Sequence, residues 1–287
     1  MANLEEVTEY CLGEFDIIQH ELSLFNNQVK GWFETHPRLI GCKPPLIHSV
    51  KHRLKDREHL RAKIQRKLIP DPESHNVEIE QTWVPENIFK SLTDLAGVRV
   101  LHLNQKQFEL IHAEISRKID STDWVLYENP KAYTWDPDSA AYFESLGIET
   151  KVKDSHYTSV HYVIRPRRES PLACEIQVRT LFEEIWGEVD HTLNYPNPTE
   201  NIACKEQLRV LAKVVGAGSR LVESIFNSVT AELMAANPPP QPQPTVERQE
   251  NVVAVQPAPH EDPLPPTERP DPEPREEGEE TPEVTHP

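Results

Sequence analysis

The sequence YTSVHYVIR at residues 157–165, followed closely by ACEIQVR at 173–179, decides the fold. Each run alternates between two kinds of side chain, as a β-strand with two different faces does. The segment between them is short enough to predict an antiparallel hairpin. We therefore expect a sheet in which these two strands lie side by side.

The hairpin also predicts a face that carries chemistry. On its second strand, Glu175, Gln177 and Arg179 share one side and apolar residues share the other. The first strand presents an aromatic ring, a hydroxyl and an imidazole together: Tyr157, Ser159 and His161. Such groups suit stacking against a base and binding of phosphate. An ordinary half-buried strand shows the same alternation, so the hairpin alone leaves both interpretations open.

Periodicity outside the hairpin predicts helices around further strands. Spacings of three and four residues predict helices at Asn3–Thr35, Lys51–Leu68, Asn87–Leu95, Phe108–Ile119, Phe182–His191 and Asn201–Ala236, with breaks considered near Gly13 and at 216–218. Alternating runs predict strands at Gly97–Leu103, Trp124–Glu128 and Glu149–Lys153, with an irregular loop between the last two. The predicted fold class is α/β (α+β), a mixed and largely antiparallel sheet flanked by helices.

Composition divides the 287 residues into two parts. Residues 238–287 hold 15 of the 27 prolines and a net charge of −9, out of −17 for the whole chain. They contain too few large apolar side chains to offset the entropy of ordering, so we predict a disordered Pro/Glu-rich tail. The first 237 residues, at −8, form the folding part.

The composition also excludes several classes of protein. No run approaches the roughly 18 apolar residues of a membrane span, and the acidic N-terminus does not look like a secretory signal. We therefore predict a cytoplasmic protein with no membrane partner. The four cysteines form no Cys-x-x-Cys pair, so reduced thiols are expected. The charge of −17 argues against non-specific coating of nucleic acid.

Two further features suggest a phosphate-binding site. Asp94 lies in DLAGVRV at 94–100, where Gly97 permits a tight turn into a strand. A carboxylate at that sheet edge could share a divalent cation with Glu175, although a lone Asp near a turn is usually a cap. The basic cluster at 51–67 is suited to phosphates, or is a solvated helix face.

Together these runs resemble the motifs of the RelA/SpoT synthetase family, of the small single-domain alarmone ((p)ppGpp) synthetase type. The matching runs are RLK at 53–55 with Lys63, DLAGVRV at 94–100, YTSVH at 157–161, and EIQVRT at 175–180 with WGEVDH at 186–191. Four motifs in the family's order, over about 140 residues, make a specific resemblance.

The resemblance implies a nucleotidyltransferase-like fold, and transfer of pyrophosphate from ATP to the 3′-hydroxyl of GDP or GTP. Carried over by motif, Asp94 and Glu175 would hold Mg²⁺, and Glu175 would also take the hydroxyl proton. The residues implied for ATP are Arg53, Lys55, Lys63 and Arg99. Those implied for the acceptor nucleotide are Lys153, Tyr157, Ser159, His161, Gln177, Arg179 and Glu184, with Tyr157 stacking on guanine.

Four positions depart from the family pattern. His156 stands where a glycine usually precedes the motif tyrosine, Thr158 follows that tyrosine, and His59 replaces a serine. Glu184 stands where many members have asparagine, and we expect its carboxylate to accept from guanine N1–H and N2–H₂. These departures leave the acceptor open: a toxic relative would use the tRNA 3′-end or adenine nucleotides, and a non-catalytic nucleotide sensor is the other alternative.

The resemblance also implies an organisation. We expect an N-terminal helical segment at 1–45, the synthetase domain at 46–196, C-terminal helices at 197–237 and the tail at 238–287. No His-Asp dipeptide occurs, which predicts a synthetase without the hydrolase of larger relatives. By analogy with small synthetases, a homo-oligomer is expected. For a tRNA acceptor, the basic path would come from Arg165, Arg167 and Arg168.

Overall fold

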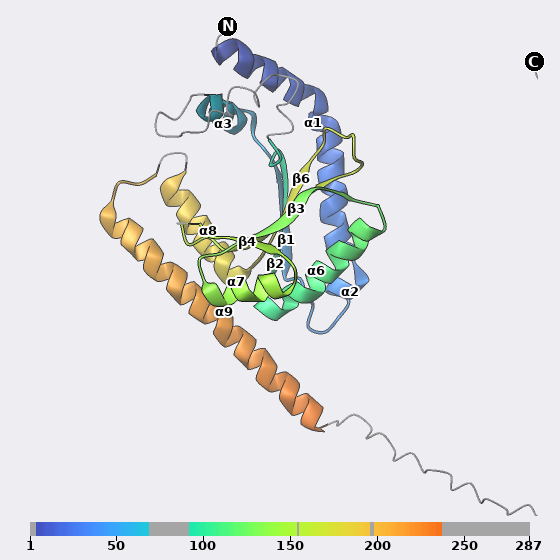
Figure 1. The fold of residues 1–287 in the computed structure, drawn as a ribbon, viewed down its shortest axis with the longest axis vertical. Coiled ribbons are helices and arrows are strands. Elements are labelled where there is room, and N and C mark those ends of the chain that lie inside the picture. The colour runs from blue at the N-terminus through green and yellow to red at the C-terminus, as the bar shows by residue number, and fades with distance from the viewer. Residues whose placement is uncertain (1–3, 69–91, 154, 196–197, 237–287) are drawn as a thin grey trace, which may run out of the picture. The chain divides into compact units, whose positions relative to one another are not determined.

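Strands from both halves of the chain pair into one mixed sheet in the order β1-β2-β6-β5-β3-β4 (Figure 1). The computed structural model describes residues 4–68, 92–153, 155–195 and 198–236, so the predicted tail lies outside the described residues. The strands are β1 (Ser49–Leu54), β2 (Ala96–His102), β3 (Val125–Tyr133), β4 (Glu149–Lys151), β5 (Ser159–Arg165) and β6 (Cys174–Thr180). The described helices are α1 (Leu4–Thr35), α2 (Pro37–Ile40), α3 (Arg57–Leu68), α6 (Gln105–Asp120), α7 (Pro137–Ser145), α8 (Leu181–Asn194) and α9 (Ile202–Ala236).

The predicted hairpin is confirmed. β5 and β6 pair antiparallel, with Val160 beside Val178 and His161 beside Gln177. β1–β2 and β3–β5 are also antiparallel, whereas β2–β6 and β3–β4 are parallel. The sheet is therefore mixed and largely antiparallel, with helices on both sides, as predicted (Figure 1).

One face of the sheet is the hydrophobic core. Its central strands contribute fully buried residues from alternate positions: Val98, Val100, Val160, Tyr162, Ile164, Ile176 and Val178. α1 and α6 cover this face with their apolar sides, among them Phe15, Val29 and Ile111 (Figure 1). α8 packs on the opposite side of the sheet and against α9. Because successive side chains of a strand point to opposite faces, the polar residues of these strands lie on the face away from the core.

The basic segment Lys51–Leu68 is not a single helix, and that prediction was wrong. Its first residues form β1, and the helix α3 begins only at Arg57. Asp56 ends the strand region because its Oδ1 accepts from the amides of Glu58 and His59, 2.9 and 3.2 Å away. A short side chain that binds its own backbone in this way starts a helix.

Residues 129–148 are also more ordered than predicted. β3 continues through Pro130, which lacks an amide hydrogen, because the strand register shifts on either side of Glu128. α7 follows, with Asp136 as its N-cap and Pro137 in its first turn. Pro130 and Asp136 are both typical of loops, but here Pro130 follows a bulge in β3 and Asp136 caps the start of α7.

The remaining helices need smaller corrections. α1 runs unbroken past Gly13, and α9 runs unbroken through 216–218. Residues 92–95 form a turn rather than the end of a helix, and the rest of the predicted helix Asn87–Leu95 lies outside the described residues. The packing of α1 on the sheet and of α9 on α8 outweighs the helix cost of each glycine, roughly 1 kcal/mol.

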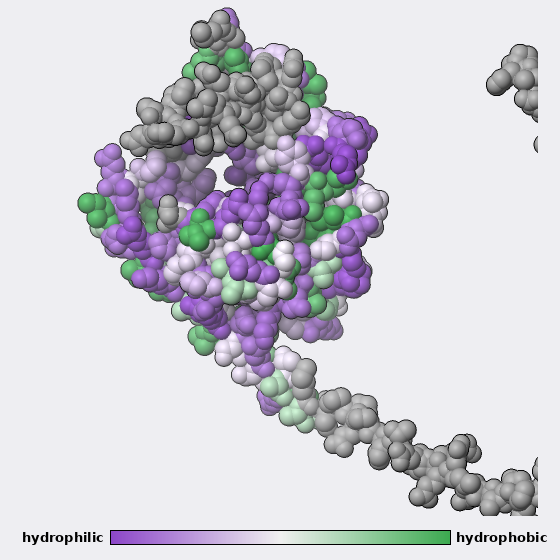
Figure 2. Space-filling view, viewed as in Figure 1, coloured by the Kyte–Doolittle hydropathy of each residue, from purple (hydrophilic) through white to green (hydrophobic). Residues whose placement is uncertain are grey.

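Hydrophilic side chains dominate the surface seen in Figure 2, with hydrophobic ones scattered along the run of α9. On this helix Val210, Val214, Leu221 and Ile225 are all more than half exposed. Within the part of the chain that the structure describes, no helix has the length and apolar character needed to span a membrane.

The packing of α1 can be tested with two residues of the same helix. Phe15 is fully buried and Ile17 is 73% exposed. We expect Phe15→Ala to lower the free energy of unfolding by about 3–5 kcal/mol, because it leaves a cavity in the core. Ile17→Ala should change it by about 0.5 kcal/mol or less. Urea denaturation measures both, and equal effects would contradict this packing.

Candidate active site

Adjacent strands bring the predicted site residues onto one face of the sheet. The parallel pairing of β2 with β6 sets Gly97 beside Glu175 and Arg99 beside Gln177. The antiparallel pairing of β5 with β6 sets His161 beside the same Gln177. Side chains at paired positions point to the same side of a sheet. These residues therefore share the face opposite to the core.

Two adjoining cavities lie on this side. The first, of about 750 Å³, is lined by Lys51, His52, Arg53, Asp94, Gly97, Val98, Arg99, Glu175, Gln177, Glu188 and His191. The second, of about 820 Å³, is lined by Arg53, Leu54, Lys55, Asp56, His59, Lys63, Arg66, Asp94, His191 and Tyr195. Both carboxylates predicted to hold metal, and all four residues predicted to bind ATP, thus line one or both cavities.

Asp94 is held between two ammonium groups. Lys55 Nζ lies 2.6 Å from Oδ2, and Lys63 Nζ lies 2.6 Å from Oδ1. Burial alone would raise the pKa of Asp94, but these two charges outweigh it and lower the pKa to about 2. Burial also lowers the pKa of Lys55. The turn before β2 therefore carries an ionised carboxylate, Asp94. It is paired with Lys55, which follows β1, and with Lys63 of α3.

Glu175 is the second buried carboxylate of the site. Its Oε1 lies 2.9 Å from His161 Nδ1, and its Oε2 accepts from Gln177 Nε2 at 2.7 Å. Burial alone would raise the pKa of Glu175, yet the hydrogen bonds from His161 and Gln177 lower it. The carboxylate is thus ionised and fixed from two strands, with lone pairs left over.

These two carboxylates are the residues predicted to hold a magnesium ion. Both face the same 750 Å³ cavity, and the charge of Asp94 acts on Glu175. Across the described ranges no cluster of three or more His, Cys, Asp and Glu side chains could hold a metal by itself. Mg²⁺ commonly takes only one or two carboxylates and completes its shell with phosphate oxygens and water. A magnesium ion shared by Asp94 and Glu175 therefore stays a prediction.

Glu184 has three cationic partners. Its Oε1 lies 2.8 Å from Lys51 Nζ and 3.3 Å from Arg99 Nη1, and its Oε2 pairs with Arg179. Burial alone would raise the pKa of Glu184, but Arg179, Lys51 and Arg99 lower it. The expected contact with guanine stays a prediction, because the structure shows this carboxylate engaged by cations of β1, β2 and β6.

The acceptor residues differ in their placement. Lys153 Nζ lies 4.9 Å from the ring centroid of Tyr157, and the Arg179 guanidinium lies 5.6 Å from the same ring. Burial lowers the pKa of Lys153, although Glu175 opposes this. Ser159 is apart from the others: it is almost fully buried, and its hydroxyl donates to the carbonyl of Val178. Tyr157 therefore offers an aromatic ring on the acceptor side, and two cations, Lys153 and Arg179, lie close to that ring.

Sequence reasoning gave no role to several residues that line the site. Lys51 and Glu188 extend the ion pairs of Arg99, with Glu188 Oε1 at 2.6 Å from Arg99. His191 stacks on Tyr195 with ring centroids 4.6 Å apart. Lys51 belonged to the basic cluster, and His191 closes the motif WGEVDH, so both lay within recognised runs. Only the fold shows that they reach the same cavity.

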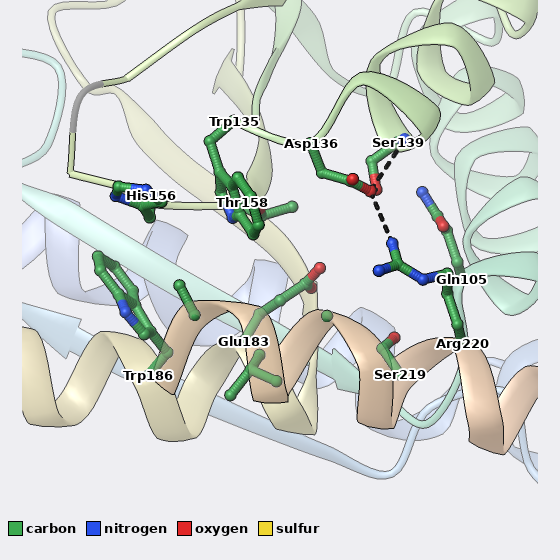
Figure 3. Close-up of a pocket in the computed structure, with 13 residues that line it drawn as sticks. Gln105, Trp135, Asp136, Ser139, His156, Thr158, Glu183, Trp186, Ser219 and Arg220 are labelled. Carbon is green, nitrogen blue, oxygen red and sulfur yellow. Dashed lines mark hydrogen bonds and ion pairs between the residues drawn. The ribbon is translucent and has the colours of Figure 1, made fainter. Parts of the chain in front are cut away.

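A separate cavity, of about 460 Å³, is lined by the two neighbours of Tyr157, His156 and Thr158 (Figure 3). Trp135 and Trp186 supply aromatic walls, and the His156 ring lies 5.0 Å from that of Trp135. His156 has a φ of +59°, in the left-handed region that favours glycine. His156 therefore holds a backbone conformation that a glycine would adopt at lower cost.

The mixed six-stranded sheet thus gathers carboxylates and cations on one of its faces. A family model described as "Region found in RelA / SpoT proteins" matches residues 52–200. The chain therefore belongs to the RelA/SpoT family, and the resemblance seen in the motifs is confirmed. No curated protein matches it in sequence.

Solved structures agree on the fold. The small alarmone synthetase 1 from Bacillus subtilis superposes with a TM-score of 0.52 at 19% identity, covering 76% of this chain and 96% of that one. The same synthetase bound to its product pppGpp gives 0.53 at 18% identity, covering 74% and 93%. A GTP pyrophosphokinase family protein from Streptococcus pneumoniae gives 0.51 at 18% identity, covering 79% and 97%. At these identities the likeness is one of fold.

The strain at His156 predicts an ordering of two variants. His156→Ala and His156→Gly both lose the ring that contacts Trp135, but only glycine relieves the left-handed backbone. We expect His156→Gly to be the more stable of the two by about 1 kcal/mol. Thermal unfolding compares them directly. A more stable alanine variant would contradict the left-handed conformation.

The ion pairs of Glu184 predict a pH-dependent loss of stability. Glu184→Gln leaves Arg179 buried without its counter-charge, so we expect a cost of about 3 kcal/mol at pH 7. The pKa of Glu184 is lowered from its ordinary value of 4.5 to about 2, so the carboxylate stabilises the fold fully above pH 4.5 and loses this effect progressively as pH falls toward 2. The difference between wild type and Glu184→Gln should shrink as pH is lowered from 5 to 3.

Glu188→Gln is the matched control for this measurement. Glu188 lies one helical turn further on, contacts the same Arg99 and is half exposed. We expect it to cost about 1 kcal/mol or less. Chemical denaturation across this pH range tests both variants, and a Glu184→Gln cost that does not vary with pH would count against the ionised carboxylate.

Proposed function

We propose that this chain transfers the β,γ-pyrophosphate of ATP to the 3′-hydroxyl of GDP or GTP. The observation that carries the proposal is the convergence of Asp94 and Glu175 on one cavity whose walls include Arg53 and Arg99. Membership of the RelA/SpoT family supports it, as does a fold shared with a small alarmone synthetase that was solved bound to its product pppGpp. Each part of the reaction then has a set of residues.

The ATP side is the cavity pair beside β1 and α3. Arg53 lies in both cavities, and Arg99 faces it from the neighbouring strand in the first. Their planar guanidinium groups can take an adenine between them. Lys55 and Lys63 then neutralise the triphosphate, exchanging the Asp94 carboxylate for phosphate oxygens. Asp94 and Glu175 would hold Mg²⁺, which when bound neutralises the charge of the transferred phosphates.

The acceptor side is the β5–β6 hairpin. Tyr157 offers a ring for a guanine base, with Lys153 and Arg179 close by for the phosphates. His161 and Gln177 hold Glu175 toward the same side. Two nucleotides in these places would meet at Glu175, which is where the acceptor hydroxyl must lose its proton.

The reaction follows from this arrangement. The 3′-oxygen bonds to the β-phosphorus of ATP, the bond from that phosphorus to the oxygen bridging to the α-phosphate breaks, and AMP leaves with the electron pair. The hydroxyl proton goes to Glu175. Phosphoryl transfer depends on positioning and charge neutralisation more than on covalent chemistry from the protein. On this face of the sheet, lysines and arginines can neutralise charge, and the hydrogen-bonded carboxylate of Glu175 is held in position.

A labelling experiment decides the function and the acceptor together. The protein is incubated with γ-labelled ATP, Mg²⁺ and, separately, GDP, GTP, ADP or tRNA. We expect label on GDP or GTP. Label only on tRNA or ADP would overturn the guanine acceptor and support a toxic relative. No transfer to any of the four would refute pyrophosphate transfer and favour a nucleotide sensor.

The role of Glu175 gives a quantitative expectation. Glu175→Gln keeps the size of the side chain but cannot take a proton, so kcat should fall by roughly 10²–10⁴-fold. Asp123→Asn, an exposed carboxylate beside Lys118 and away from both cavities, should leave kcat unchanged. Initial rates of AMP release measure both. A Glu175→Gln enzyme within threefold of wild type would remove this residue from the proposed chemistry.

A further inference from the structure

The cavity of about 460 Å³ beside Tyr157 is separate from the site of the proposed reaction. Among the described residues, none that lines it also lines either of the two cavities around Asp94. We call it the aromatic cavity, after the rings of Trp135, His156 and Trp186 that line one end of it (Figure 3). A concave space with aromatic walls and a few polar groups is the usual form of a small-molecule site.

The aromatic end of the cavity suits a flat ring. The His156 ring lies 5.0 Å from that of Trp135 at an interplanar angle of 54°. Trp186 is almost fully buried, and its Nε1 donates to the carbonyl of Leu208 at 3.1 Å, so α9 holds this indole in place. Rings that the fold already holds can stack on a planar ligand without first having to be ordered.

Asp136 and Arg220 close the other end. Arg220 Nη1 lies 3.1 Å from Asp136 Oδ2, which also accepts from the amide and the hydroxyl of Ser139. Figure 3 shows this group opposite the aromatic rings, with the Glu183 carboxylate between the two ends. Asp136 and the guanidinium satisfy each other, so the charge that faces the middle of the cavity is that of Glu183.

Glu183 has room for hydrogen-bond donors. Its Oε2 accepts from the amide of Thr180 at 2.7 Å, in the capping box that starts α8, and this bond leaves lone pairs free. Burial raises the pKa of Glu183, and the charge of Asp136 acts in the same direction. N–H donors on a ligand would favour the ionised carboxylate, because hydrogen bonds to the charged form stabilise it.

The charges of the lining determine the kind of ligand. Among the described lining residues, the carboxylates of Glu183 and Asp136 face one guanidinium that is already paired, so a phosphate would meet net repulsion. A neutral or cationic ligand avoids this repulsion. Two adjacent N–H donors on a flat ring, as in a cyclic amidine or guanidine, match a carboxylate while the ring itself meets the indoles.

The walls of the aromatic cavity also contact the acceptor side. His156 and Thr158, which flank Tyr157 in the chain, both line the cavity. The Trp186 ring lies 6.4 Å from the Tyr157 ring at an interplanar angle of 57°. A ligand that holds these three residues therefore also restricts Tyr157, which couples the cavity to the acceptor base.

We propose that the aromatic cavity binds a neutral or cationic flat heterocycle with two adjacent N–H donors, and that the bound ligand holds Tyr157 in place. Glu183 accepts from the donors, and the rings of Trp135, His156 and Trp186 receive the heterocycle. The binding site does not depend on the proposed function. Its effect on the acceptor does, since that effect takes Tyr157 as the ring that stacks on guanine.

A pair of probes tests the class of ligand. 2-Aminobenzimidazole has a flat ring with adjacent N–H donors, and 2-methylbenzimidazole has the same shape with a methyl group in place of the amino group. In isothermal titration calorimetry, the amino probe should bind the wild type at least about tenfold more tightly. Equal affinities, or no binding of the amino probe at millimolar concentration, would overturn the proposal.

Gly216→Leu tests the location of the site. Gly216 lines the cavity from α9, and a Cβ added there meets Arg220 Nη2 at 3.8 Å, an ordinary contact. The leucine side chain takes up space in the cavity, so the affinity for the amino probe should fall at least about tenfold. Gly13→Leu, at a position of α1 where an added Cβ meets nothing within 4 Å, is the matched control and should bind as the wild type does. Binding that Gly216→Leu leaves unchanged would put the probe elsewhere and overturn the proposal.

Glu183→Gln tests the carboxylate. Glutamine also completes a capping box, so the start of α8 keeps its bond to the Thr180 amide, and circular dichroism should show a folded variant. A single amide oxygen cannot replace two carboxylate oxygens, so this variant should bind the two probes with affinities within about threefold of each other. A preference for the amino probe as large as that of the wild type would contradict the role of Glu183.

Enzyme kinetics test the coupling to Tyr157. In the wild type, a saturating concentration of the amino probe should lower the KM for the acceptor about threefold, and in Gly216→Leu it should leave this KM unchanged. A KM that rises in both proteins would mean that the probe competes for the acceptor site, and an unaltered wild-type KM would overturn the coupling. A wild type that transfers no pyrophosphate would overturn the proposed function instead, while calorimetry would still decide the binding site.

Discussion

The parallel pairing of β2 with β6 is the constraint on which the site depends. It places Gly97 beside Glu175, so the turn that carries Asp94 ends next to a carboxylate 81 positions later in the chain. β1 and β5 then add their residues from either side of this pair. The core helices α1 and α6 bury the opposite face, which fixes the register because a slip of one residue would bury the charges.

Charge balance is the second feature that unites the structure. Lys55 and Lys63 are paired with Asp94, and Arg99 and Arg179 are paired with Glu184. Without those carboxylates, cations this close together would repel one another and lose solvation. Phosphates carry the same charge as the carboxylates, so a nucleotide can replace one set of partners with another. The proposed function uses the ion pairs that already hold the face together.

Alternation and motif order were enough to predict the hairpin, the fold class and the family. They could not show that β1 precedes α3, because a short charged strand and a basic helix have similar composition, and only pairing with β2 separates them. The left-handed backbone of His156 was invisible, although the missing glycine pointed to that position. The hydrogen bond between Tyr157 and His161 could not be predicted from the sequence either, since a shared face does not specify which atoms meet.

The central claim is that two nucleotides react at Glu175 with pyrophosphate as the transferred group. Mass spectrometry of a reaction containing ATP, Mg²⁺ and GDP measures this most directly. The account predicts a guanine nucleotide heavier by one pyrophosphate, with ³¹P NMR placing that group on the 3′-oxygen, and one AMP for each product molecule. Formation of ADP and inorganic phosphate, with GDP unchanged, would contradict it.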